Sequence, residues 1–200
     1  MSRSSMLGLA VVATAILAPG AAWAHVGGGS TSSFNSGFFH PLGGLDHVLA
    51  MVAVGMFAAN LGGRGLWAVP MAFVALMAGG GLLGIEKVAI PFVEAGIALS
   101  VVVLGLMVAL QARWPVAAAM ALVGVFAIFH GHAHGEEMPI DGSGAAYAAG
   151  FMIATAILHF AGIALGIALQ QVGSSYWQRA AQLSGGAMTL AGVALLTGVV

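Results

Sequence analysis

Histidine is the commonest ionisable residue of this chain, with seven His against five Lys and Arg together and six Asp and Glu together. Three histidines alternate with small residues in the stretch Phe-His-Gly-His-Ala-His-Gly-Glu-Glu at 129–137. In a helix, His130, His134 and Glu137 would lie within a sector of about 60°. Two imidazoles and a carboxylate suit Ni²⁺, Co²⁺, Zn²⁺ or Cu²⁺, and the absence of cysteine argues against a soft-metal site.

The same stretch has a second interpretation. The glycines at 131 and 135 weaken a helix, and a flexible histidine-rich loop would bind metal adventitiously. The two interpretations differ at His132 and Glu136, which face away from the other three ligands only if the helix forms. We favour the helical face, so His130, His134 and Glu137 are candidate ligands.

A second polar stretch reads His40-Pro-Leu-Gly-Gly-Leu-Asp46-His47. Pro41 suits the first turn of a helix, and the two glycines permit an irregular backbone that brings His40 towards the other two. Asp46 and His47 would point about 100° apart in a helix, so that one binds metal while the other orients it. The alternative is a helix cap, because an aspartate near a helix N-terminus is favoured by the helix dipole.

The rest of the composition indicates a membrane protein. Hydrophobic residues make up 60% of the chain, charged residues only 6%, and the mean hydropathy is +1.05. So little polar surface cannot coat a soluble globule, whereas it suits helices packed in lipid. With five basic residues and a formal charge of −1, the chain offers no surface for nucleic-acid phosphates.

The N-terminal residues resemble a secretory signal. Arg3 precedes an apolar run over 6–18, and Ala-Trp-Ala at 22–24 fits a cleavage site. We expect residues 1–24 to be removed, which leaves His25 as an N-terminal amine and imidazole able to collect metal. The alternative is an uncleaved first span. The Gly- and Ser-rich residues 25–39 are expected to form a mobile exported segment.

The remaining chain is predicted to be a single all-α domain, residues 25–200, made of six transmembrane helices. A helix of about 20 residues crosses a bilayer. Glycines four residues apart, as at 80 and 84 or at 162 and 166, allow helices to approach closely. The apolar windows are 41–59, 66–85, 90–110, 115–134, 145–169 and 180–200.

Topology follows from the basic residues. With an exported N-terminus and six spans, Arg64, Arg113 and Arg179 lie on the cytoplasmic side and Lys87 lies outside, as the positive-inside rule requires. Both termini are then extracytoplasmic. Every acid and six of the seven histidines gather towards the outer face, which the positive-inside rule does not explain. We therefore expect this face to attract a cation.

Two ionisable residues are expected at greater depth, Glu94 early in the third window and His159 near the middle of the fifth. A carboxylate inside a bilayer costs about 2.5 kcal/mol or more, so we expect Glu94 to serve the ion. The evidence for His159 is evenly divided, because a neutral imidazole can also simply bond to a neighbouring helix.

The two polar stretches resemble those of the HupE/UreJ family of hydrogenase and urease accessory membrane proteins. The family patterns His-Pro-x-x-Gly-x-Asp-His and Phe-His-Gly-x-Ala-His-Gly-x-Glu are matched completely at 40–47 and 129–137. The resemblance implies a nickel permease that supplies nickel-enzyme maturation. By position, it also implies metal-handling roles for His40, Asp46, His47, His130, His134, Glu137 and Glu94.

The expected function is therefore uptake of Ni²⁺, with Co²⁺ and Zn²⁺ as alternatives, without ATP and without a bound cofactor. A cytoplasmic nickel acceptor is an expected partner. We do not expect an enzyme, because the chain lacks a His-Glu-x-x-His signature and a nucleophile elbow. A membrane-embedded metal hydrolase and a metal sensor without transport remain the alternatives. The sequence leaves open the oligomeric state, the choice between channel and carrier, and which nickel enzyme is served.

Overall fold

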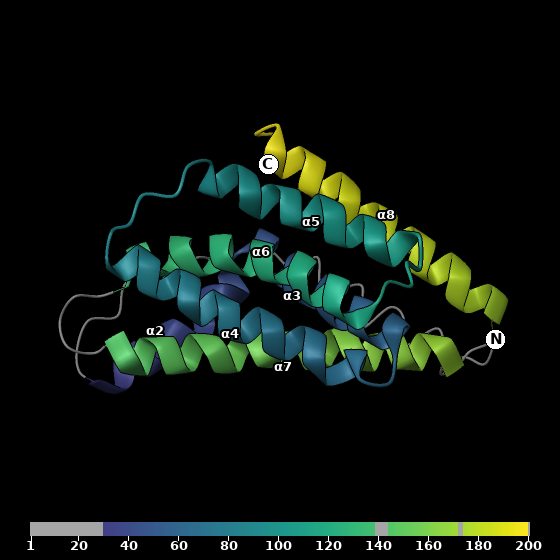
Figure 1. Ribbon diagram of the computed structural model, residues 1–200, viewed down its shortest axis with the longest axis horizontal. Coiled ribbons are helices and arrows are strands. Elements are labelled where there is room, and N and C mark those ends of the chain that lie inside the picture. The colour runs from purple at the N-terminus through teal and green to yellow at the C-terminus, as the bar shows by residue number, and fades with distance from the viewer. Residues whose placement is uncertain (1–29, 139–143, 172–173, 200) are drawn as a thin grey trace.

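The computed structural model describes residues 30–138, 144–171 and 174–199. Within these residues the chain forms seven helices and no strand (Figure 1), which confirms the all-α class. Each of the six predicted windows corresponds to one of the last six helices. The helices are α2 (Ser30–Gly43), α3 (Leu45–Leu61), α4 (Gly65–Ile85), α5 (Val93–Ala109), α6 (Val116–Glu136), α7 (Gly144–Gln171) and α8 (Ser174–Leu196).

Not all of the six helices that match the predicted windows are long and apolar enough to cross a bilayer. Of the described helices, α4, α6 and α7 meet both conditions, and α2 with α3 would make a fourth span if this pair, bent by 80°, crosses as one. Helix α5 has 17 residues, which is about 25 Å of helix and short for a span. The structure supports a membrane protein with three or four candidate spans, and the six-span count stays a prediction. The predicted signal, residues 1–24, and His25 lie outside the described residues.

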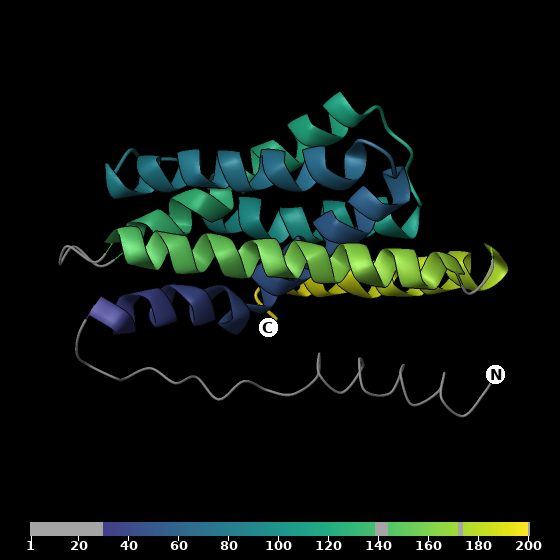
Figure 2. The same ribbon diagram turned by 90° about the horizontal axis from the view of Figure 1, so that it is seen from below.

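Helix α2 corrects the expectation of a mobile segment up to residue 39. Residues from Ser30 onwards are helical, and Pro41 lies at the end of α2 instead of in the first turn of the next helix. The helix forms because it packs along α7, where Gly37 lies against the backbone of Tyr147 and Gly150 against that of Phe34. Figure 2 shows α2 running beside α7. Tertiary packing therefore overrides the weak local propensity of this segment.

The helices associate in pairs through glycines. In four pairs, a Cβ on the glycine of one helix would collide with the backbone of the other, so the backbones nearly touch. Such contacts are the usual way in which helices associate in membranes, where burying apolar surface gives little gain. They confirm the close approach predicted at 80 and 84 and at 162 and 166. The pairs are α2 with α7 (Gly37, Gly150), α3 with α7 (Gly55, Gly162), α4 with α6 (Gly80, Gly84, Gly131, Gly135) and α5 with α8 (Gly105, Gly185).

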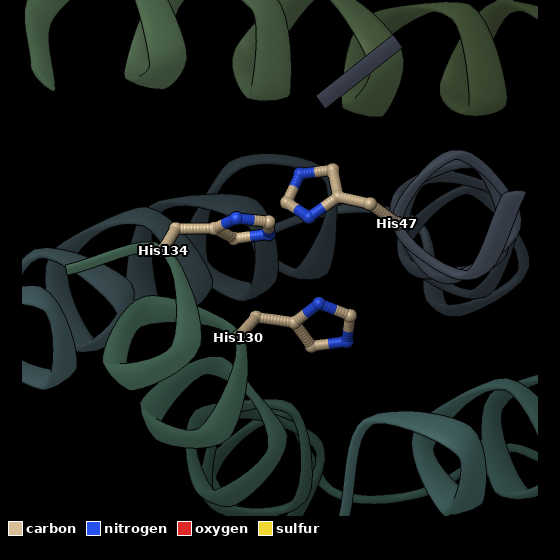
Figure 3. Close-up of side chains that lie close together, drawn as sticks. All are labelled: His47, His130 and His134. Carbon is tan, nitrogen blue, oxygen red and sulfur yellow. The ribbon is translucent and has the colours of Figure 1, made fainter. Parts of the chain in front are cut away.

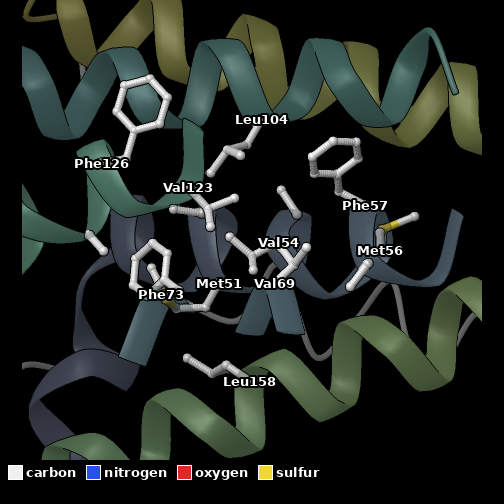
Figure 4. Close-up of a cluster of buried hydrophobic side chains, with 14 of the residues drawn as sticks. Met51, Val54, Met56, Phe57, Val69, Phe73, Leu104, Val123, Phe126 and Leu158 are labelled. Carbon is white, nitrogen blue, oxygen red and sulfur yellow. The ribbon is translucent and has the colours of Figure 1, made fainter. Parts of the chain in front are cut away.

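The buried core fills the space between α3, α4, α5, α6 and α7 (Figure 4). Its largest apolar members include Met51, Phe57, Phe73 and Leu104, and each of them is 0% exposed. Four histidines are buried as completely as these apolar residues, and they are His47, His130, His132 and His159. Buried imidazoles in an apolar core need partners or a function, and they define the candidate site.

Candidate metal centre

Two groups of three ligands lie at one end of the bundle. The exposed group consists of His40, His134 and Glu137, and the buried group consists of His47, His130 and His134. In each group the three ligand atoms lie within 4.8 Å of one another. His134 belongs to both groups, and its two ring nitrogens give it the means to serve both. Among the described residues, no other group of three or more His, Asp or Glu comes as close.

The exposed group joins the end of α2 to the end of α6. The Nε2 atom of His40 lies 3.1 Å from the Oε2 atom of Glu137 and 3.1 Å from the Nδ1 atom of His134. The Nδ1 atom of His134 lies 3.3 Å from the same carboxylate oxygen. The hydrogen bond from His134, together with the nearby imidazoles, lowers the pKa of Glu137 from its ordinary value. The carboxylate is therefore charged and available to a cation.

The buried group lies one turn deeper. His47 comes from the first turns of α3, while His130 and His134 come from successive turns of α6 (Figure 3). The ring centroid of His47 is 5.2 Å from that of His130 and 5.2 Å from that of His134. His47 is 1% exposed and His130 is 0% exposed. Three imidazoles converging in a dry pocket form a nitrogen site of the kind that first-row transition metals occupy.

A serine fixes the ring of His130. The hydroxyl of Ser100, on α5, donates to the carbonyl of Ile97 over 2.6 Å. The same hydroxyl oxygen lies 2.9 Å from the Nε2 atom of His130, and with its only proton already donated it can only accept there. His130 therefore carries its proton on Nε2. Its Nδ1 atom, which has no partner among the described residues, keeps a lone pair for metal.

A threonine does the same for His47. The hydroxyl of Thr155, on α7, points at the sulfur of Met77 over 4.0 Å, and its oxygen lies 3.1 Å from the Nε2 atom of His47. The Nδ1 atom of His47 has no partner among the described residues, so it is the nitrogen left for metal. Hydroxyls on two further helices, α5 and α7, thus contact the Nε2 atoms of both buried ligands.

Phe151, on α7, covers both groups. Its ring centroid lies 4.5 Å from that of His134 and 5.0 Å from that of His47. Beside it, an apolar cavity of about 210 Å³ opens between α4, α6 and α7 and reaches His134. The aromatic ring adds apolar surface next to the imidazoles, and an apolar surrounding strengthens an ion–ligand interaction.

The predicted helical face of α6 is present, but its three members divide between the groups. The helix runs through both glycines to Glu136, and Glu137 joins the exposed group while His130 joins the buried one. His132 faces away, as the helical face predicts. It is 2% exposed, and its Nε2 atom lies 2.6 Å from the carbonyl of Val88, so it attaches α6 to the loop before α5.

Other candidate residues lie outside both groups. The carboxylate of Asp46 accepts the backbone N–H of the next residue, His47, over 2.6 Å within the first turn of α3, whose cap residue is Gly44. Glu94 was expected deep in a span, and this expectation is wrong. Helix α5 begins at Val93, so Glu94 lies in its first turn with an exposed side chain. Metal-handling roles for Asp46 and Glu94 stay predictions.

Comparison with known proteins identifies the family. The model of the family described as HupE / UreJ protein matches residues 11–195. The chain belongs to the HupE/UreJ family. Protein HupE of Rhizobium leguminosarum bv. viciae is 50% identical over 184 residues, which is 92% of this chain and 94% of that relative. No solved structure matches the chain.

In this HupE/UreJ chain, sequence reasoning missed Ser100, Thr155 and Phe151. A signal for the two hydroxyls was present, since Ser100 and Thr155 are rare polar residues within strongly apolar helices. Such residues commonly bond across helices in a membrane. The apolar windows gave no comparable signal for Phe151, because an aromatic residue there also suits ordinary packing.

Proposed function

We propose that this chain is a secondary permease for a divalent transition metal, with Ni²⁺ as the first candidate, that supplies hydrogenase or urease maturation. The observation that carries the proposal is that His134 is shared between an exposed and a buried three-ligand group at one end of an apolar helix bundle. A purely structural metal site has no need of a second, exposed ligand set. Membership of the HupE/UreJ family supports the same role.

Capture begins at the exposed group. The charged carboxylate of Glu137 attracts a hydrated dication, and the imidazoles of His40 and His134 replace part of its water. The ion then exchanges His40 and Glu137 for His47 and His130 while His134 remains a ligand. Sharing one ligand lowers the cost of each exchange, because the ion is never stripped of all its ligands at once.

Selection and direction follow from the donor set. Ca²⁺ and Mg²⁺ prefer shells of oxygen, so a buried group of three imidazoles favours a transition metal. The sequence has no nucleotide-binding motif, and a membrane potential of 100 mV supplies about 4.6 kcal/mol for a doubly charged ion. We place the two groups on the outer side of the plasma membrane, both termini outside, and a nickel acceptor in the cytoplasm. Beyond the metal ion and these partners, the proposed transport needs no cofactor.

Uptake of radioactive Ni²⁺ into proteoliposomes tests the proposal. The parent protein should accumulate metal under an imposed potential, negative inside. His134→Ala should abolish accumulation, because both groups lose a ligand. His132→Ala is the matched control, since it removes an imidazole from the same helix but from neither group. Its uptake at saturating metal should equal that of the parent.

Other outcomes separate the alternatives. Absence of uptake by the parent, with Ni²⁺ binding intact, contradicts a permease and favours a sensor. Hydrolysis of a substrate that depends on His134, without uptake, favours a metal hydrolase. Competition by Co²⁺ and Zn²⁺ in the same vesicles measures which ion the donor set prefers.

A further inference from the structure

Among the described residues, His159 is the buried histidine that belongs to neither ligand group and has no hydrogen-bond partner. It lies on α7 and is 1% exposed. Neither its Nδ1 atom nor its Nε2 atom has a hydrogen-bond partner among the described residues. A buried polar group without a partner destabilises the folded protein, and an apolar residue at this position would avoid that cost. Packing alone therefore does not account for an imidazole here.

Its place on α7 aligns it with the buried group. Phe151, Thr155 and His159 follow one another at intervals of four residues, which puts them on one face of the helix at steps of about 6 Å. Phe151 packs on the rings of His134 and His47, and Thr155 bonds to His47. His159 thus continues the same face one turn deeper into the bundle.

Two residues of α4 contact this face of α7, and they do so in the reverse sequence order. Met77 meets Thr155, and Phe73, one turn before it and deeper in the bundle, meets His159. The ring centroid of Phe73 is 5.2 Å from that of His159 and 5.9 Å from that of His130. Phe73 therefore packs against both His130 of the buried group and His159, and Figure 4 shows Phe73 within the apolar core.

We propose that His159 is a third ligand position, to which the metal ion passes after the buried group. The inference rests on the proposed transport and adds the inner half of the path to it. An imidazole with two free nitrogens binds the same class of ion as His47 and His130. A single protein ligand holds the ion more weakly than three, which suits release towards the far side of the membrane.

A cysteine at this position provides a direct test. The chain contains no cysteine, so His159→Cys introduces the only thiol, and a thiolate bound to Co²⁺ gives an intense charge-transfer absorption. We expect this absorption when Co²⁺ is added to the purified variant. The control is Leu158→Cys, which is equally deep on α7 but points about 100° away and should not give the absorption. Absence of the absorption in His159→Cys, with the weak Co²⁺ bands of the buried imidazoles present, overturns the proposal.

Transport by His159→Phe is the second measurement. The aromatic ring fills the space of the imidazole but cannot bind metal. We expect uptake to fall about tenfold or more while the affinity of the protein for Ni²⁺ stays that of the parent. Uptake equal to that of the parent contradicts the third position and leaves the permease intact. Affinity and uptake falling in the same proportion contradicts it too, because His159 would then support the buried group. Failure of the parent itself to transport contradicts the proposed function instead.

Discussion

Ser100→Ala tests whether the tautomer of His130 is set by the serine. The hydroxyl of Ser100 is fully buried and accepts the Nε2 proton of His130 over 2.9 Å, while donating its own proton to Ile97. Alanine removes the acceptor without adding volume. The metal-free protein can then move the proton of His130 to Nδ1, which occupies the nitrogen that the metal needs.

The expected size of the effect follows from that change. To bind metal through Nδ1, the variant must return the proton to Nε2 and leave it buried without a partner, which costs about 1–3 kcal/mol. Since about 1.4 kcal/mol corresponds to a factor of ten, the affinity should fall by about 5- to 150-fold. Thr155→Val should act in the same way through His47, because its hydroxyl makes the corresponding contact.

Calorimetric titration of the purified protein with Ni²⁺ measures this affinity. Ser184→Ala is the matched control, because Ser184 on α8 bonds only to the backbone of its own helix, at Ala180 and Ala181. The control should bind as the parent does. If Ser100→Ala also binds like the parent while remaining folded, the serine does not select the tautomer and the assignment of Nδ1 as ligand is refuted.

Four further predictions concern residues at the same end of the bundle. Uptake should fall in an acid external medium, because a protonated imidazole cannot bind metal. The pKa of Glu137 is lowered, first by the hydrogen bond from His134, so the contribution of its carboxylate is lost only below the ordinary range of a glutamate. Glu137→Gln should therefore weaken uptake without moving the midpoint of the pH profile, and a shifted midpoint would contradict this. His132→Ala should lower the melting temperature, because the variant loses the hydrogen bond to Val88, which is worth about 1 kcal/mol. Its rate of metal uptake into vesicles at saturating metal should equal that of the parent. Glu94→Gln should lower uptake at low metal concentration in folded protein, because the carboxylate lies in the first turn of α5, directly after the loop whose Val88 contacts His132. Unchanged uptake would make Glu94 a surface residue only.

The helices were largely predictable, whereas their ends were not. Apolar windows of about 20 residues located α3 to α8, because a helix in an apolar chain shows in composition alone. Helix α2 was missed, since its Gly and Ser residues favour a loop and only the contact with α7 makes it helical. The depth of Glu94 was misjudged because Pro91 lies in a turn, and the left-handed backbone of Phe92 then delays the start of α5 to Val93.

The candidate ligands were predictable from residue type, but their grouping was not. Helical spacing placed His130, His134 and Glu137 on one face, and the structure keeps that face. Spacing within one helix carries no information on what the facing helices contribute. The assignment of His40 to the exposed group and of His47 to the buried group depends on the bend between α2 and α3, which the sequence did not predict. A bend of 80° between adjacent helices puts two histidines seven residues apart at different depths against α6.

The glycines of the histidine motif explain how these depths are maintained. Gly131 and Gly135 weaken α6 as an isolated helix, yet both lie against the backbone of α4, at Met77 and Gly81. Contact between backbones leaves no flexible side chain to absorb a shift, so α6 is fixed along and around its axis. Each glycine directly follows a ligand histidine and faces about 100° away from it. The same turns of α6 therefore carry both the glycines that pack on α4 and the histidines that face the ion. Because the packing on α4 fixes the position of α6, it also sets the distance between the imidazoles of α6 and His47.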